Sequence, residues 1–313
     1  MAGARVLSSR VKGTGSIYWL PMKTPPNDAP AAAARRLDAN AVHAVLRRLQ
    51  RQPEAPWLHG EVARRMAERL ALIRMKPALL FDWWGHLGAS AEVLAEVCPQ
   101  AQRFAVEPSA ALLERSAATA RALSTRAELP AGAQLVWANM MLHLVPEPPL
   151  LIERWFRLLA VDGFVMFSCL GPGTLRELRA LYERLGWPAP TPDFIDMHDL
   201  GDMLVHAGFA DPVMDQETLT LRWDSAEALL AELRALGGNA APDRMPGLRS
   251  PRWRARLLRE LESLRGIDGK LGLSFEIAYG HAFKAAPRLK VGEAAVVSLE
   301  DMRTMLRSDA ARR

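Results

Sequence analysis

The stretch LLFDWWGHLGAS, residues 79–90, combines residue types that could hold a nucleotide-like cofactor. Its first half is typical of a buried strand, and Asp82 stands where that strand ends. Gly85 and Gly88 would let the backbone turn tightly and approach a ligand, and the helix expected after them would direct N–H groups to the same place. A glycine pair alone is weak evidence, because ordinary turns contain such pairs too. The stretch is therefore a candidate cofactor turn, or a piece of core that resembles one.

Glu107 is the second candidate, because it ends the next expected strand, about 25 residues after Asp82. A carboxylate at this place can accept hydrogen bonds from both hydroxyls of a ribose. The alternative is a solvated carboxylate at the start of a helix, which the helix dipole would favour by itself. Taken alone, the residue leaves both interpretations open.

Strand and helix patterns alternate around these residues. Four segments have the apolar composition of buried strands, at 78–81, 103–107, 133–142 and 164–170. Helical patterns fall between them, at about 91–98, 109–123 and 150–160, and Ser109 is the expected N-cap of the second. This spacing is typical of βαβ units and predicts an α/β, Rossmann-like fold, with a mostly parallel sheet and helices on both faces. The ligand of such a sheet lies beyond the carboxyl ends of the strands, where Asp82 and Glu107 stand.

Three parts are expected along the chain. Residues 1–36 contain a single acid and lack periodicity, so they indicate a disordered or non-native leader, with a targeting peptide as the alternative. One domain is expected over 37–290, with a helical, arginine-rich lid insertion at about 225–268 before the last strand. Residues 291–313 are expected to form a C-terminal tail.

The composition limits the possible functions. Half of the residues are hydrophobic, but no apolar run reaches the ~20 residues of a membrane helix, so a soluble protein without membrane contact is expected. Cys98 and Cys169 are too few for a disulfide framework or a zinc site, which indicates a reducing cytoplasm and no metal. The net charge of +5 suits an acidic partner. We expect a monomer that does not bind nucleic acid.

Asp82, the two glycines and Glu107 together have the arrangement of a class I S-adenosylmethionine-dependent methyltransferase. Longer motifs resemble one family of this class, the malonyl-acyl-carrier-protein O-methyltransferases of biotin synthesis. These motifs are NMMLHLV, GFVMFSCLGPGTLRELR, FIDMHDLGDMLVHAGFADPVMD, TLTLRW and SFEIAYGHAFK. The resemblance runs from about Leu37 to Lys284 and is densest from Gln134 onward.

The resemblance implies S-adenosyl-L-methionine as the cofactor. The residues that match its binding motifs are Asp82, Trp84, Gly85, Gly88 and Glu107. The implied reaction is methylation of the free carboxylate of a malonyl thioester on an acyl carrier protein. Because that carboxylate is already ionised, the enzyme must mainly orient it and exclude water. Polar residues after strands or under the lid are the candidates to hold it, namely Asn139, Ser168 and His198.

The lid insertion carries a run of arginines. Carrier proteins are strongly acidic, so a docking surface is expected at Arg249, Arg252, Arg254, Arg256 and Arg259. The alternative is a solvated helix face with no partner.

The chain departs from the family pattern on the cofactor side. Where the motif reads acid-x-Gly-x-Gly-x-Gly, this chain has Trp84 and His86 at the first two glycine positions and keeps Gly88. A bulky residue there is expected either to turn away or to fill the methionine pocket, with the strain of a positive φ.

Two further departures are expected from the sequence. The interval from Glu107 to Gln134 is short, so we predict that a strand is missing there, leaving Glu128 as the one acid near the adenine. Gln52 replaces an aromatic residue that closes over the cofactor, with Trp57 as a possible substitute. Three hypotheses follow: an active methyltransferase, a pseudoenzyme that keeps the carrier-protein surface as a binding or regulatory partner, and another reaction on the same fold.

Overall fold

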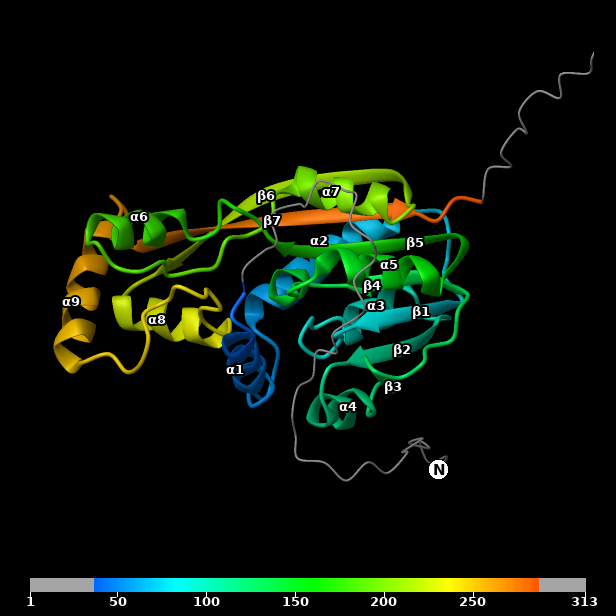
Figure 1. Ribbon diagram of the computed structural model, residues 1–313, viewed down its shortest axis with the longest axis horizontal. Coiled ribbons are helices and arrows are strands. Elements are labelled where there is room, and N and C mark those ends of the chain that lie inside the picture. Colours follow the sequence, from blue (N-terminus) through cyan, green and yellow to red (C-terminus); the bar gives the residue numbers. More distant parts are fainter. Residues whose placement is uncertain (1–36, 287–313) are drawn as a thin grey trace, which may run out of the picture.

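A computed structural model describes residues 37–286, and the leader and tail expected at 1–36 and 291–313 lie outside this range. Seven strands form one sheet in the order β3-β2-β1-β4-β5-β7-β6 (Figure 1). They are β1 (Leu79–Trp83), β2 (Gln102–Glu107), β3 (Arg121–Ser124), β4 (Ala133–Ala138), β5 (Leu159–Leu170), β6 (Ala210–Trp223) and β7 (Leu271–Phe283). The first five strands pair in parallel, and β7 is antiparallel to both β5 and β6. The predicted Rossmann-like α/β fold is confirmed.

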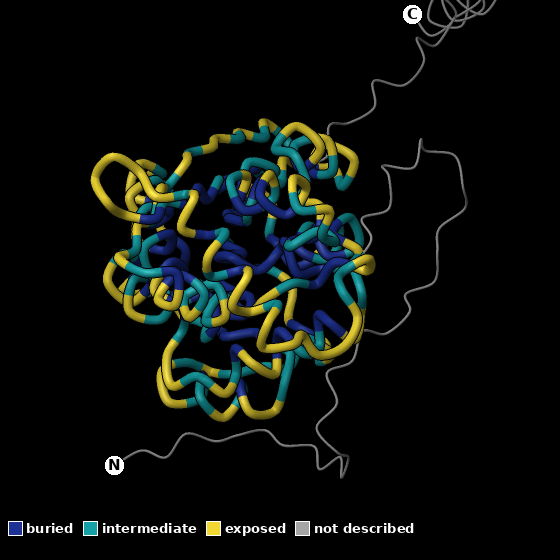
Figure 2. Tube along the Cα trace, turned by 90° about the vertical axis from the view of Figure 1, so that its left-hand side faces the viewer, coloured by how far each residue is buried: buried dark blue, intermediate teal, exposed yellow. Residues whose placement is uncertain are grey.

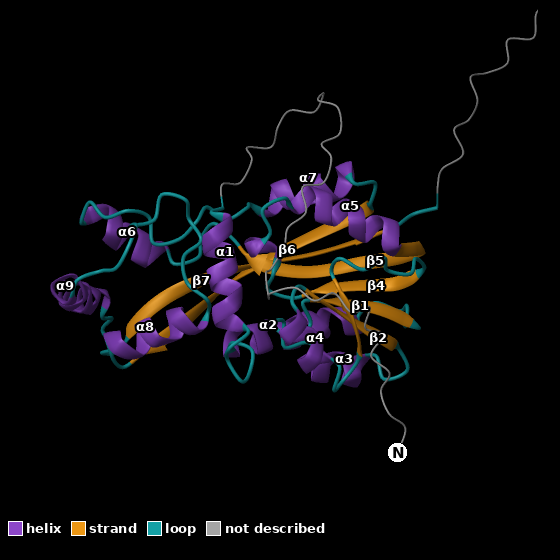
Figure 3. Ribbon diagram, turned by 60° about the horizontal axis from the view of Figure 1, so that its bottom comes forward, coloured by secondary structure: helices purple, strands orange, loops and turns teal. Residues whose placement is uncertain are grey.

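Helices cover both faces of the sheet (Figure 3). One face packs against α1 (Ala39–Leu49), α4 (Ala110–Ser116), α5 (Pro148–Leu158) and α7 (Met197–His206). The other packs against α2 (Trp57–Ala71) and α3 (Ala91–Val97). Successive strand residues alternate between the two layers, so Phe81 and Trp83 face the first and Leu80 the second. Buried residues gather in the interior and exposed ones on the outer loops (Figure 2).

The long strands β6 and β7 extend beyond the rest of the sheet. The last β5–β7 pair joins Leu170 to Ile277, so residues 271–276 of β7 pair with β6 and not with β5. This two-stranded extension carries α6 (Arg176–Arg184), α8 (Ala226–Ala235) and α9 (Pro251–Leu261), seen at the left of Figure 1 and called the lobe below. The Glu177 carboxylate ties α6 to β7 by accepting hydrogen bonds from the Ser274 N–H at 3.0 Å and hydroxyl at 2.6 Å. The lobe is thus continuous with the sheet.

The segment between β2 and β4 differs from the prediction. The expected helix at 109–123 ends at Ser116, and residues 121–124 form β3, parallel to β2 with Glu107 opposite Ser124. The prediction of a missing strand was therefore wrong. A seven-residue helix and a four-residue strand fit the short interval, and the alanine-rich sequence carries no period that would separate them. Ser109 caps α4 as predicted, accepting from the Leu112 N–H.

Two shorter helices complete the described elements, η1 (Leu142–Leu144) and η2 (Glu262–Leu264). Within residues 37–286, every helix is too short or too polar to cross a lipid bilayer.

Candidate functional site

The turn after β1 passes directly over the Asp82 carboxylate. A Cβ added to Gly85 would lie 2.3 Å from Asp82 Oδ2, so only glycine fits this position. The Trp84 N–H donates to the Val106 carbonyl at 2.8 Å, which attaches the start of the turn to β2. Gly85 therefore serves a close backbone approach to the protein's own Asp82 carboxylate, whereas Gly88 lies close to the Ser90 hydroxyl and the Asn139 carbonyl.

Asp82 is buried, and neither of its oxygens has a hydrogen-bond donor of normal geometry among residues 37–286. It is 1% exposed, and its nearest cation is Arg103, whose Nη1 lies 3.9 Å from Oδ2. Burial raises the pKa of the carboxyl to about 7, and Arg103 and the nearby Ser90 hydroxyl oppose that shift. A ligand that supplies hydrogen-bond donors or positive charge would stabilise a buried carboxyl in this state.

Glu107 lies beside the turn with one oxygen satisfied and one not. Its Oε1 accepts from the His86 N–H at 2.8 Å and from the Ser116 hydroxyl at 2.7 Å, while Oε2 is buried without a partner. Burial raises the pKa of this carboxyl to about 7 as well. Glu107 therefore holds the turn in place through one oxygen, while its other oxygen can still accept a hydrogen bond. The solvated-carboxylate alternative is wrong, because Glu107 is fully buried.

Trp84 and His86, the two bulky residues of the turn, behave differently. Trp84 adopts φ 57°, the left-handed region, and its indole is 2% exposed within the core layer that contains α1. The expected positive φ is confirmed. His86 does not have a positive φ, and its Nε2 lies 3.3 Å from Arg115 Nη1. Desolvation and Arg115 lower the pKa of His86, so the imidazole is neutral at pH 7. One substitution strains the backbone and the other does not.

Asn139 and Ser168 lie together in a buried network at the ends of β4 and β5. The Ser168 hydroxyl donates to Asn139 Oδ1 at 2.6 Å and accepts from the Met140 N–H at 3.1 Å. Asn139 Nδ2 donates to the Gly88 carbonyl at 2.6 Å and to the His59 carbonyl at 2.8 Å. Their polar groups are thus used in holding the cofactor turn against β4, β5 and α2.

His59 was missed by the sequence analysis. It lies in the first turn of α2, is 3% exposed, and its Nδ1 lies 2.7 Å from the Leu87 carbonyl. Burial lowers its pKa to about 4. The helical pattern of α2 marks buried positions but does not show which of them face the turn, so no sequence signal singled this histidine out.

The remaining candidates lie at the periphery. His198 is exposed in the first turn of α7, where its N–H donates to Asp196, and no hydrogen bond joins it to Asn139 or Ser168. Gln52 donates to the Ala235 carbonyl at 2.7 Å and so supports α8. Trp57 is 58% exposed.

The predicted adenine acid is not buried in the sheet as Asp82 and Glu107 are. Glu128 is exposed in the loop after β3, and Ser124 occupies the end of that strand.

The lobe arginines fall into two groups. Arg249 stacks over Trp253 with 3.7 Å from its Cζ to the ring centroid, and Arg256 lies over Trp187 at 5.5 Å. The two indoles are themselves packed, with ring centroids 4.9 Å apart. The other three arginines are exposed on α9 and form no ion pair with any residue in 37–286, namely Arg252, Arg254 and Arg259. We call these three the free arginines.

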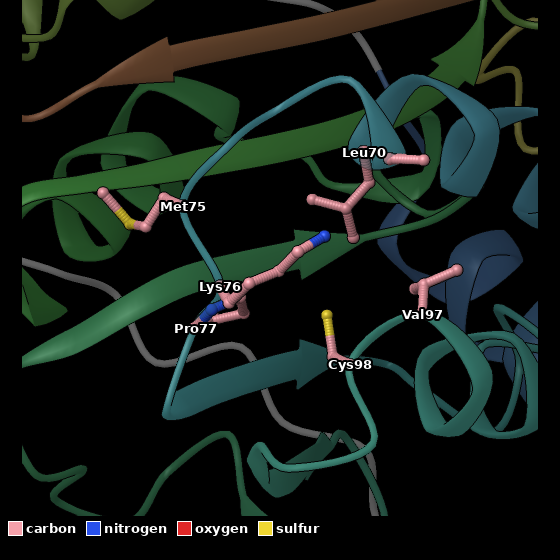
Figure 4. Close-up of a pocket in the computed structure, with 7 residues that line it drawn as sticks. Leu70, Met75, Lys76, Pro77, Val97 and Cys98 are labelled. Carbon is pink, nitrogen blue, oxygen red and sulfur yellow. The ribbon is translucent and has the colours of Figure 1, made fainter.

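A crevice of about 200 Å³ lies at the opposite end of β1 from the turn. Leu70, Met75, Pro77 and Cys98 contribute to its walls, and Lys76 extends along it (Figure 4). Because the unsatisfied carboxyls stand at the carboxyl ends of β1 and β2, the crevice is separate from the candidate site.

Comparison with curated proteins identifies the family. A malonyl-[acyl-carrier protein] O-methyltransferase of Gallionella capsiferriformans is 38% identical over 257 residues, covering 77% of this chain and 88% of that protein. The chain belongs to the malonyl-[acyl-carrier protein] O-methyltransferase family. Family members of the same name from Laribacter hongkongensis and Nitrosospira multiformis are 36% and 32% identical, over 85% and 86% of their own lengths. A scan against protein-family models finds no match.

Proposed function

We propose that this protein transfers a methyl group from S-adenosylmethionine to the free carboxylate of a malonyl group carried by an acyl carrier protein. The names of its relatives support the substrate, and the chain spans most of their length. The observation that carries the proposal is the set of unsatisfied buried acceptors around the turn: both oxygens of Asp82 and Oε2 of Glu107.

These acceptors fit the chemistry of the cofactor. S-adenosylmethionine carries two ribose hydroxyls, an ammonium and a sulfonium, so it brings the donors and the positive charge that the turn lacks. An ionised Glu107 would take the ribose hydroxyls through Oε2 while Oε1 keeps the turn in place through His86. Asp82 adds negative charge beneath Gly85, which favours a cationic ligand.

The chain's own residues position and enclose rather than exchange protons. When bound, the cofactor would supply an electrophilic methyl group, and no residue would be needed as a general base, because the malonyl carboxylate is already ionised. Asn139 and Ser168 act as positioning residues, because their hydrogen bonds fix the turn relative to β4 and β5. His198 is exposed and remains the candidate to hold the substrate carboxylate. The buried surroundings of the turn exclude water from the reacting groups.

The lobe docks the carrier protein in this proposal. The free arginines present three cations on one short helix, and electrostatic attraction to an acidic partner would speed encounter and orient the malonyl arm. Arg249 and Arg256 support this surface by ordering the aromatic cluster beneath it. We place the protein in the cytoplasm as a monomer, in keeping with a sequence that holds only two cysteines, too few for a disulfide framework.

The binding-only alternative gains no support over the enzyme. The relatives are named as methyltransferases, and the sheet contains β3, the strand that was expected to be missing.

Calorimetric titration with S-adenosylhomocysteine tests the proposal. Wild-type protein should bind, Glu107→Gln should weaken binding by about 100-fold through loss of a charged acceptor, and Glu114→Gln should not. Glu114 is the matched control, because it is an exposed acid on α4 beside the same site. Absence of binding to the wild-type protein would overturn the proposal.

A further inference from the structure

The acceptors around the turn can be counted one by one. Each backbone carbonyl from Trp84 to Gly88 already has a donor within the protein. Trp84 accepts from the Gly88 N–H, Gly85 from Ser90 and His86 from Ala89, at 2.9–3.3 Å. The last two carbonyls accept from side chains, Leu87 from His59 and Gly88 from Asn139. Each of these carbonyls thus already accepts one hydrogen bond, so the acceptors that remain wholly unused beside the turn are on side chains.

Besides the two carboxyls, one buried side chain offers such an acceptor. The contact between His59 Nδ1 and the Leu87 carbonyl requires Nδ1 to carry the proton, because a carbonyl can only accept. In the neutral imidazole Nε2 then holds a lone pair, and among residues 37–286 no group forms a hydrogen bond to it. His59 is 3% exposed, so this unused acceptor belongs to a side chain that is almost entirely enclosed.

Glu107 and His59 contact the turn from opposite sides. In the sheet β1 lies between β2 and β4. Glu107 ends β2 and binds the turn through His86, whereas His59 is joined to Asn139 at the end of β4 and binds the turn through Leu87. An elongated ligand whose ribose is held by Glu107 would extend across the end of β1 and present its other end on the β4 side.

We infer that His59 is a cofactor-binding residue whose Nε2 accepts a hydrogen bond from the ammonium of the methionine moiety of S-adenosylmethionine. This inference rests on the proposed function, and it adds a residue that neither the sequence motifs nor the comparisons assign. The ammonium is the donor at the end of the cofactor remote from the ribose. A neutral imidazole suits that place, because an imidazolium would repel both the ammonium and the nearby sulfonium. Asp82 and Glu107 supply the countercharge from beneath and beside the turn, with Arg103 as their cationic neighbour and Arg115 beside His86.

Two variants of His59 separate its two roles, which are to accept a hydrogen bond at Nε2 and to donate one from Nδ1 to the Leu87 carbonyl. His59→Asn keeps an amide N–H near the place of Nδ1, so it can still donate to Leu87, but it has nothing at the place of Nε2. His59→Gln reaches the place of Nε2 with an acceptor and loses the donor to Leu87. His206→Asn, on an exposed residue of α7, is the control for the substitution itself.

The test compares two ligands on the full chain by calorimetry. S-adenosylhomocysteine has the amino-acid end, and 5′-methylthioadenosine lacks it. For His59→Asn we expect S-adenosylhomocysteine to bind about tenfold or more weakly, with 5′-methylthioadenosine unchanged and the melting temperature near that of the wild type. His59→Gln should recover part of the lost affinity.

Three results would overturn the inference: unchanged binding of S-adenosylhomocysteine to His59→Asn, equal weakening of both ligands, or no difference between the two variants. Equal weakening would show that His59 only supports the turn. If the wild-type protein binds neither ligand, the proposed function is wrong, and the inference, which depends on it, is wrong as well.

Discussion

Charged side chains are treated in opposite ways at the cofactor turn and on the lobe. At the turn Asp82 and Glu107 are fully enclosed, and three of their four oxygens lack a hydrogen-bond donor. On the lobe the free arginines are exposed on α9, above arginines that are ordered by aromatic stacking. Burial of unsatisfied acceptors opposes folding, whereas exposed arginines cost little.

The contrast indicates which of the two regions is stabilised by binding its ligand. Unsatisfied carboxyls destabilise the protein until donors and positive charge arrive, so the turn is completed by its ligand. The lobe is complete by itself and needs only a partner of opposite charge. Loss of a carboxyl at the turn should therefore change binding and stability in opposite directions, while loss of a free arginine should change binding alone.

Glu107→Gln tests the turn and has the largest expected effect on stability. The folded pKa of about 7 lies above the ordinary value of 4.5, so ionisation opposes folding as the pH rises through this window and above it. The neutral amide removes that penalty, and we expect the ligand-free variant to be more stable by roughly 2–3 kcal/mol at pH 8. The gain should shrink as the pH falls toward 5. Urea unfolding at both pH values measures it, and a loss of stability at pH 8 would contradict the account.

Trp84→Gly asks whether the replaced glycine position belongs to the core. Removal of a buried indole costs about 3–5 kcal/mol, and relief of the left-handed backbone returns about 1–3 kcal/mol. We therefore expect a net loss of roughly 2 kcal/mol by denaturant unfolding. His86→Gly, two residues away with an ordinary φ and a half-buried side chain, should change stability far less. Equal effects of the two substitutions would show that Trp84 is not anchored in the core.

Reversal of the charge of the free arginines tests the lobe. Arg252→Glu, Arg254→Glu and Arg259→Glu together should raise KM for the malonyl-carrier protein by about tenfold or more, with S-adenosylhomocysteine affinity and melting temperature unchanged. The difference should diminish at high salt. Arg222→Glu, on β6 and paired with Asp268, provides the control for a charge reversal elsewhere on the surface. An unchanged KM would show that the carrier protein does not dock on α9.

The smallest effect is expected at Arg249. Its stacking on Trp253 and its hydrogen bond to the Tyr182 hydroxyl at 3.2 Å should stabilise the lobe by about 0.5–1 kcal/mol. Arg249→Ala should lose this much by thermal unfolding, and Arg249→Lys should lose less. If Arg252→Ala is as destabilising as Arg249→Ala, the division into supporting and free arginines is wrong.

The sequence predicted the sheet well because buried parallel strands such as β1 and β4 are apolar and bounded by turns. It failed at β3, an edge strand of four partly exposed residues that continues an alanine-rich helical pattern. At the site it identified Asp82 and Glu107 by their places after strands. It did not identify His59, since the contact with Leu87 joins residues 28 positions apart. Nor did it separate the stacked arginines from the free ones, because Trp187 comes from a distant segment.

The most direct test of the central claim is methyl transfer itself. The protein is incubated with methyl-labelled S-adenosylmethionine and with carrier protein bearing either a malonyl or an acetyl thioester. The account predicts base-labile label on the malonyl form alone, strongly reduced in Glu107→Gln and retained in Glu114→Gln. Absence of label on malonyl-carrier protein, under conditions in which S-adenosylhomocysteine binds, would contradict it.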